Sequence, residues 1–339
     1  MNARRGKGSA VDSTGGATPA GAGPARTGAL AVLATPSGAF AVLGGAALVF
    51  QTWVLGRWVA GGGMHSAPSS GYRISTAREA VTWAAQGGIP VIALVMGLVI
   101  VRASRRAGRV TLDLALLLGF FLGFWQSPLF NYRQLAILMN RYAVNVTTWG
   151  PYIPGWHGPD AGGQVETPLA LSGVSFFLLI LWYWVQGWAT DRIAARRPHW
   201  GWGRLLPASL LAGWAGAAAI ELAWMSTGLY SYAAPLAHLT LFPGHWYRLP
   251  LLYPLADAVF LSTAPVVMRH EELARGRVPY VFRGTELLAL RSGNALRLLA
   301  GVGLANILLL GYFAACLLLS GSLAGPTSDA PSYLWPVGR

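Results

Sequence analysis

The chain has 339 residues, of which 54% are hydrophobic and only 11% charged, and its formal net charge is +13. A soluble domain carries about 25% charged residues, so this composition indicates a protein in contact with lipid hydrocarbon. The basic residues flank apolar stretches and do not alternate with aromatic residues, which argues against a nucleic-acid partner. A single cysteine, Cys316, excludes intramolecular disulfides and cysteine-rich metal sites. Its apolar neighbours indicate a packing residue.

The N-terminal residues 1–37 are rich in Gly, Ala, Pro, Ser and Thr. Such a segment cannot bury a core, and we predict a disordered tail without the pattern of a secretory leader. Seven apolar segments follow, each close to the roughly 20 residues needed to cross about 30 Å of hydrocarbon. We predict helices over 38–60, 80–101, 110–130, 169–189, 205–229, 249–268 and 296–320.

The predicted fold class is therefore all-α, a polytopic transmembrane helical bundle of about seven spans. It forms one transmembrane domain over 38–320, followed by a C-terminal tail over 321–339. Of the 25 basic residues, 18 lie in the N-terminal tail and in the loops 102–109, 190–204 and 269–297. These segments alternate correctly along the chain, so the positive-inside rule places the N-terminus inside and the C-terminus outside. We expect a multi-pass protein of the cytoplasmic membrane whose inner arginines contact anionic lipid.

The longest outer segment, 125–168, is rich in aromatic residues, Pro and Asn. Irregular backbone near a membrane must be covered by protein or water, so we expect this segment to fold back as a lid, with an amphipathic helix around 131–145. Its asparagines are uncharged hydrogen-bonding groups, and its Trp and Tyr rings offer flat apolar surface. An interfacial aromatic belt explains the same rings without any ligand.

Two carboxyl groups lie deep inside predicted spans. Glu221 is eight residues before one outer helix end and Asp257 is eight residues after the next. At 1.5 Å per residue both lie about 12 Å below the outer surface, so consecutive antiparallel helices can bring them together. Two interpretations remain open: each carboxyl hydrogen-bonds a neighbouring helix, or the two form a desolvated pair that can act as an acid. Asp113, by contrast, lies in a first helical turn, where a carboxylate is stabilised by the helix itself.

The sequence indicates no metal site and no cofactor. Three histidines, His157, His238 and His245, lie on the predicted outer side, but none has the spacing of a metal-binding pair. His245 is the one expected to line a pocket. The chain also lacks a Walker loop, a dinucleotide-binding fingerprint and a nucleophile elbow.

Two stretches of the chain resemble one known family. WQSPLFNY followed by NRYAVNVTTWGPYIPGW, and later IELAWMSTGLYSY followed by LFPGHWYRLPLLYPLADA, are similar to the spirocyclase AveC-like membrane proteins of actinomycetes. The resemblance covers roughly 110–270. Members in macrolide pathways of the avermectin, meilingmycin and milbemycin type make spiroketals, and some also dehydrate the spiroketal ring. Many members have an acidic residue where Gln126 and Ser127 stand, and another near Tyr253 or Pro254. The departures shift the expected chemistry to the two carboxyls inside the helices.

The resemblance implies a lipophilic dihydroxy-ketone polyketide as substrate and a 6,6-spiroketal as product. We expect Glu221 to be the general acid and Asp257 to be its partner or to stabilise the cation, because ring closure passes through an oxocarbenium ion. The outer segment would orient substrate hydroxyls and form the wall that sets stereochemistry. The predicted substrate contacts are Asn131, Tyr132, Asn140, Tyr142, Asn145, Thr147, Thr148, Trp149, Trp156, Tyr230 and His245.

Two rival functions fit the same sequence. The same acid and base can remove water from a ring alcohol, which makes the protein a dehydratase alone or after cyclisation. A buried carboxyl pair in a helical bundle also fits a proton-coupled transporter or a binding protein, although no inverted repeat is visible. One difficulty concerns access, because a polyketide is made in the cytoplasm and the two carboxyls lie toward the outer side. A lipophilic substrate can partition into the bilayer and enter sideways.

Overall fold

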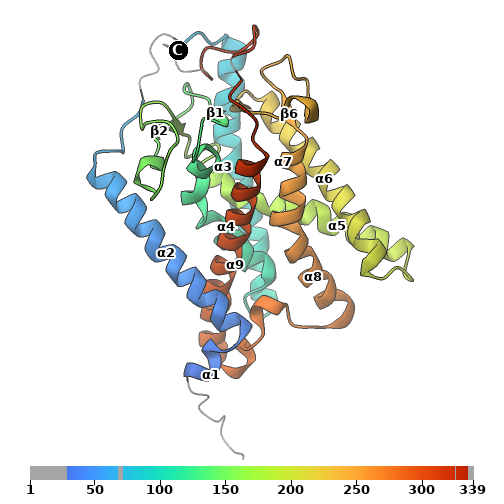
Figure 1. Ribbon diagram of the computed structural model, residues 1–339. Helices are drawn as coiled ribbons and strands as arrows, with labels where there is room; N and C mark the ends of the chain where they lie inside the picture. The colour runs from blue at the N-terminus through green and yellow to red at the C-terminus, as the bar shows by residue number, and fades with distance from the viewer. Residues whose placement is uncertain (1–28, 68–71, 325, 335–339) are drawn as a thin grey trace, which may run out of the picture.

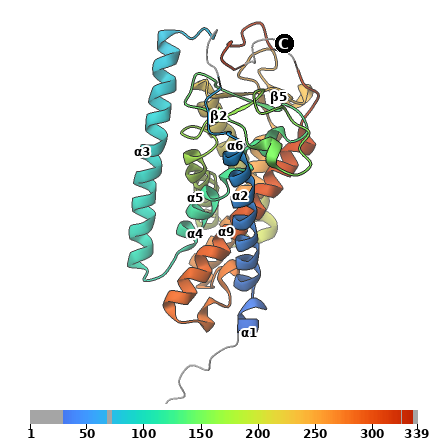
Figure 2. The same ribbon diagram turned by 90° about the vertical axis from the view of Figure 1, so that its left-hand side faces the viewer.

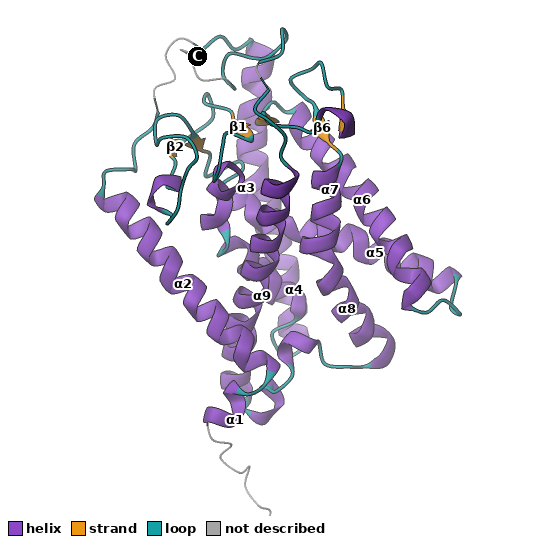
Figure 3. Ribbon diagram, in the orientation of Figure 1, coloured by secondary structure: helices purple, strands orange, loops and turns teal. Residues whose placement is uncertain are grey.

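The computed structural model describes residues 29–67, 72–324 and 326–334 and shows a helical bundle with short strands gathered at one end (Figures 1 and 3). The helices of the bundle are α1 (Ala29–Leu33), α2 (Pro36–Ala60), α3 (Thr76–Arg106), α4 (Leu112–Phe121), α5 (Ile180–Arg196), α6 (Trp202–Ser226), α7 (Leu252–Ala256), α8 (Thr263–Arg275) and α9 (Leu290–Leu319). Between α7 and α8 the chain forms one π-helical segment, η5 (Asp257–Ser262). Short 3-10 segments include η1 (Phe124–Asn131) and η3 (Val174–Leu179).

Four helices in the described part of the chain, α2, α3, α6 and α9, are long and apolar enough to cross a membrane. A fifth span is present if α4 and η1, which are bent by 56° relative to each other, are counted together. The predicted segments 169–189 and 249–268 are broken. Gly173 and η3 delay α5 until Ile180, and η5 divides the other segment. The seven-span topology and the orientation of the termini stay predictions.

Helix α9 occupies the centre of the bundle. The most apolar window of α9 is 56% buried, against 22% for α2 and 28% for α3, and Figure 2 shows α3 along one side. Close packing around α9 depends on glycine. A Cβ atom on Gly303 would lie 1.9 Å from the Phe40 carbonyl oxygen of α2, and one on Gly119 of α4 would lie 2.6 Å from the Gly301 carbonyl oxygen. The small residues therefore let three helix backbones approach one another.

Three two-stranded antiparallel ribbons cover one end of the bundle (Figure 3). They pair β1 (Ile137–Met139) with β4 (Tyr230–Tyr232), β2 (Val146–Thr147) with β3 (Val165–Glu166), and β5 (Thr240–Leu241) with β6 (Leu249–Pro250). The prediction of an amphipathic helix around 131–145 is wrong. The Asn131 side chain accepts hydrogen bonds from the N–H groups of Ala136 and Ile137, which turns the chain, and β1 then pairs with β4.

The two predicted tails are partly described. Residues 1–28 lie outside the described residues, whereas α1 and the start of α2 fall within the predicted N-terminal tail. At the other end, Tyr333 and Leu334 are buried, and the Tyr333 carbonyl accepts a hydrogen bond from the Arg141 N–H. The C-terminal segment therefore packs on the ribbons.

Replacing Gly303 with Ala should destabilise the bundle, because the new Cβ meets backbone atoms of α2 that cannot rotate away. We expect a loss of about 1–3 kcal/mol in the free energy of unfolding, measured as a lower unfolding temperature of the detergent-solubilised protein. Gly45→Ala on α2 is the matched control, since nothing lies within 4 Å of its new Cβ. Equal unfolding temperatures for the two variants would show that the α2–α9 contact is looser than described.

Candidate active site

Glu221 belongs to a single buried stripe of α6. The buried residues of this helix recur every four positions, from Leu205 to Met225, and Glu221 is one of them, with 7% of its surface exposed. Residues four apart share one face of an α-helix, and this face packs against α5, where Gln186 contacts Ser209. The helix thus turns a carboxyl group toward the interior of the bundle and away from lipid.

Two tyrosines of β4 hold this carboxyl group. Alternate residues of a strand point to the same side, so Tyr230 and Tyr232 both face Glu221 while Ser231 points away. Both phenols donate hydrogen bonds to Glu221 Oε2, at 2.8 Å for Tyr232. Burial, and then the neighbouring Glu221 carboxyl, raise the pKa of both phenols well above their usual value of 10.0. Both therefore stay protonated hydrogen-bond donors and hold Oε2, while neither bonds Oε1.

Asp257 begins the π-helical segment η5. A π segment inserts an extra residue into a helix and is frequent at functional sites. The wide turn is supported locally by Thr263, whose hydroxyl donates to the Ala258 carbonyl five residues back. Asp257 is 2% exposed. Tyr312 and Trp182 approach its carboxyl, but no well-formed hydrogen bond from a described residue reaches its Oδ2 atom.

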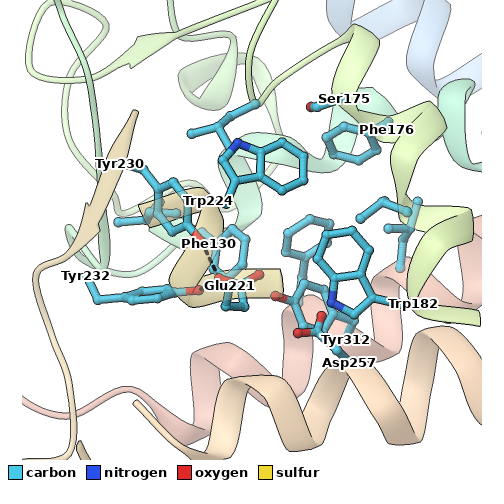
Figure 4. Close-up of a pocket in the computed structure, with 15 residues that line it drawn as sticks. Phe130, Ser175, Phe176, Trp182, Glu221, Trp224, Tyr230, Tyr232, Asp257 and Tyr312 are labelled. Carbon is cyan, nitrogen blue, oxygen red and sulfur yellow. Dashed lines mark hydrogen bonds between the residues drawn. The ribbon is translucent and has the colours of Figure 1, made fainter. Parts of the chain in front are cut away.

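Both carboxyl groups line one cavity of about 80 Å³, smaller than the roughly 300–1,000 Å³ of pockets that hold drug-sized ligands. The cavity lies between α5, α6, η5 and α9, and the β1–β4 ribbon closes one side of it. Most of its wall is aromatic or aliphatic. Figure 4 shows Glu221 with Tyr230 and Tyr232 on one side and Asp257 with Tyr312 and Trp182 on the other. The structure thus brings the two predicted carboxyls together; their catalytic role stays a prediction.

Of the predicted substrate contacts, only Tyr230 lines this cavity. The three asparagines are buried, and their amides bond mainly to backbone: Asn131 to the turn before β1, Asn140 to the turns around Tyr142 and Gly228, and Asn145 to the N–H of Ala67. They shape the outer segment from within, because their side chains replace missing backbone partners.

The other predicted contacts also have partners in the outer layer. These pairs are Tyr132 with the Pro154 carbonyl, Tyr142 with Glu79, Thr147 with the Gly63 carbonyl, Thr148 with Glu166, Trp149 with the Trp125 carbonyl, Trp156 with the Pro159 carbonyl, and His245 with Asp329. Trp149 also packs edge-on against Trp58 of α2. The structure therefore places these residues outside the cavity that contains the two carboxyls.

Sequence reasoning missed several residues of the cavity, among them Trp182, Tyr232, Tyr312 and Trp224. The GLYSY stretch contains a signal for Tyr232, since two tyrosines in alternating positions after a helix fit a strand with one polar face. Trp182 and Tyr312 give no such signal, because an aromatic residue in an apolar helix looks the same whether it faces lipid or a cavity.

A third buried carboxyl, Glu166 on β3, was also missed. It is 0% exposed and lies outside the helices that can cross a membrane. Its oxygens accept hydrogen bonds from Ser127 at 2.8 Å, Thr148 at 2.7 Å and Gln164 at 3.0 Å. Burial raises its pKa to about 7, although these donors oppose the shift. Glu166 thereby joins η1, the residue after β2, and β3.

Glu166→Gln should remove part of the pH dependence of stability. The pKa of Glu166 rises from an ordinary 4.5 to about 7 on folding, so the folded state keeps its proton while the unfolded state loses it. Between these pH values wild-type stability falls as pH rises, by roughly 3 kcal/mol in total. We expect the unfolding temperature of wild type to drop more between pH 5 and 8 than that of the variant. Parallel pH curves would show that Glu166 ionises as easily as an exposed carboxyl.

No group of three or more His, Cys, Asp or Glu side chains within the described ranges is arranged to hold a metal ion. The polar groups of the cavity are carboxyls, phenols, indoles and the Ser175 hydroxyl. Such a set can donate a proton, accept one, and present π-faces to a cation.

The sequence was compared with known proteins, solved structures and protein-family models. No curated protein and no solved structure gives a significant match. A family model described as spirocyclase AveC-like matches residues 106–335. This is more than half of the chain, and it includes every residue that lines the cavity between Phe130 and Phe313. The chain belongs to the spirocyclase AveC-like family.

Proposed function

We propose that this protein is a spiroketal cyclase that closes a dihydroxy-ketone polyketide by acid-assisted loss of water. Family membership implies a role in spiroketal formation in polyketide pathways. The observation that supports the specific chemistry is the pair of carboxyls, Glu221 and Asp257, facing one largely apolar cavity. Four or five apolar helices that can cross a membrane fit a protein of the cytoplasmic membrane, where a lipophilic substrate concentrates.

The reaction requires one acid and one acceptor. A first hydroxyl adds to the ketone and gives a hemiketal. Glu221 protonates the hemiketal hydroxyl, water leaves, and an oxocarbenium ion forms. The second hydroxyl then attacks this carbon, a new C–O bond forms, and the released proton passes to Asp257. The net change is the loss of one water, and proton return from Asp257 to Glu221 restores the site. General acid–base assistance of this kind contributes about 10²–10⁴-fold.

The cavity also offers groups for the cation itself. An anionic carboxyl stabilises an oxocarbenium-like state in glycoside hydrolysis, and Trp and Tyr faces attract cations by about 0.5–2 kcal/mol. Trp182, Trp224 and Tyr312 line the cavity beside the carboxyls. Because a difference of about 1.4 kcal/mol between the two faces of attack already gives a tenfold product ratio, this rigid aromatic wall supports stereocontrol of a reaction that also proceeds unaided.

Glu221→Gln should abolish stereoselective closure, because the amide keeps its size but cannot donate the acidic proton. The purified protein in lipid nanodiscs is given 1,9-dihydroxynonan-5-one, and chiral gas chromatography measures the enantiomer ratio of the spiroketal. Wild type should give an excess that the variant lacks. Glu272→Gln, at the far end of α8 and paired with Arg109, should behave as wild type.

The same experiment separates the rival functions. A product that has lost a second water identifies a dehydratase. The same racemic product as without protein, together with uptake by proteoliposomes, identifies a transporter. Equal enantiomer excess in wild type and Glu221→Gln would remove Glu221 from the mechanism.

The double variant Tyr230→Phe and Tyr232→Phe should lower the rate of stereoselective closure by about 30- to 150-fold, the loss expected for two buried hydrogen bonds of about 1–1.5 kcal/mol each. Both rings stay, so the walls keep their shape, but Glu221 loses the donors that orient it. Tyr142→Phe, which removes a phenol bonded to Glu79 in the outer layer, is the control outside the cavity. A rate equal to wild type would show that Glu221 does not depend on these phenols.

A further inference from the structure

The cavity contains polar atoms that no described protein group satisfies. Asp257 Oδ2 and Trp182 Nε1 are buried and lie close to each other, yet neither atom makes a well-formed hydrogen bond to a described residue, and the two residues are 2% and 4% exposed. Trp224 Nε1, on α6, is also buried without a hydrogen-bond partner among the described residues. Leaving one such group unpaired costs about 1–3 kcal/mol, so these three atoms around one cavity are sites where a ligand, or water in its place, can form hydrogen bonds.

The hydrogen-bonding chemistry of Trp182 and Asp257 limits which functional group of a ligand can bind between them. Figure 4 shows the Trp182 indole nitrogen turned toward the Asp257 carboxyl. An indole N–H only donates a hydrogen bond, and an ionised carboxyl only accepts one. Beside an ionised Asp257, a ketone or ether oxygen can accept from Trp182 but gives nothing to the carboxyl, whereas an ammonium group does the reverse. A protonated Asp257 can itself donate to a ketone or ether oxygen. A hydroxyl group satisfies both, because it accepts through its lone pairs and donates through its hydrogen.

We propose that Trp182 and Asp257 together bind one hydroxyl group of the substrate. Resting on the proposed function, we assign this hydroxyl as the one that closes the second ring. The Trp182 N–H holds its oxygen while its hydrogen points to Asp257 Oδ2. When the oxygen bonds to the oxocarbenium carbon, its O–H bond breaks and the proton passes to Asp257 Oδ2. Trp182 keeps its own proton throughout and acts by orienting the attacking oxygen, so it sets the face of attack.

The test measures binding with ligands that cannot react. The probe is 4-(tetrahydropyran-2-yl)butan-1-ol, which has one closed ring and the second hydroxyl but no ketone. Its two relatives are 2-butyltetrahydropyran, without the hydroxyl, and the methyl ether of the probe. Affinities for the full-length protein in nanodiscs are measured by calorimetry, with uptake by empty nanodiscs subtracted. We expect the hydroxyl to improve affinity about tenfold and the methyl ether to lose this gain, because it cannot donate to Asp257.

In Trp182→Phe the preference for the hydroxyl should fall to about twofold or less, while binding of 2-butyltetrahydropyran stays as in wild type and shows an intact cavity. The matched control is Trp188→Phe on the same helix, since Trp188 is 60% exposed and does not line the cavity; it should keep the wild-type preference.

Three results would overturn the proposal. They are an undiminished preference in Trp182→Phe, equal binding of the hydroxyl and methyl ether ligands to wild type, and no binding of any of the three compounds. If Trp182→Phe fails to fold, the comparison of the hydroxyl and methyl ether ligands in wild type still tests whether the ligand hydroxyl donates a hydrogen bond. A wild-type protein that prefers the hydroxyl but gives no enantiomer excess of spiroketal would refute the proposed function and leave this binding site standing.

Discussion

The structure depends on keeping two carboxyl groups inside an apolar bundle. A buried carboxyl without partners is costly, and the protein meets this constraint differently for each group. Glu221 receives two phenol hydrogen bonds at one oxygen, so its position is fixed by β4, a strand outside the helix that carries it. Asp257 retains an unpaired oxygen facing the cavity. The protein thereby holds Glu221 in place, whereas Asp257 can still form a hydrogen bond with a bound molecule.

The positions of the cavity residues depend on the helices, on the π-helical segment and on the β1–β4 ribbon. Glycines on α2, α4 and α9 let the helix backbones approach closely, which sets the position of α9 and of Tyr312 on it. The π-helical segment η5 shifts the helical register between α7 and α8 at Asp257, which lines the cavity. The β1–β4 ribbon supplies Ile137, Tyr230 and Tyr232 as one wall. The site is thus assembled from parts of the chain far apart in sequence.

The outer segment 125–168 supports the cavity, whereas its composition predicted that it would contact the substrate. Its asparagines, Trp149 and Thr148 bond within the outer layer, and Glu166 joins that layer to η1 through Ser127. Since η1 also contributes Phe130 to the cavity wall, the outer layer acts on the site by supporting it. This connection gives the protein a second buried carboxyl cluster whose protonation affects the stability of the scaffold.

The sequence by itself determined the helical class, the apolar helices and the two carboxyls within them, because hydropathy and a charge placed in hydrocarbon are local signals. It did not determine the breaks before α5 and in η5, the strands that replaced a predicted helix, or the partners of Glu221. It also assigned substrate contacts to the outer asparagines, whose amides are in fact used by backbone groups, and gave no sign that Glu166 is buried. These features were decided only by tertiary structure, since the pairing of β1 with β4 and the facing of Trp182 toward Asp257 join residues that are distant along the chain.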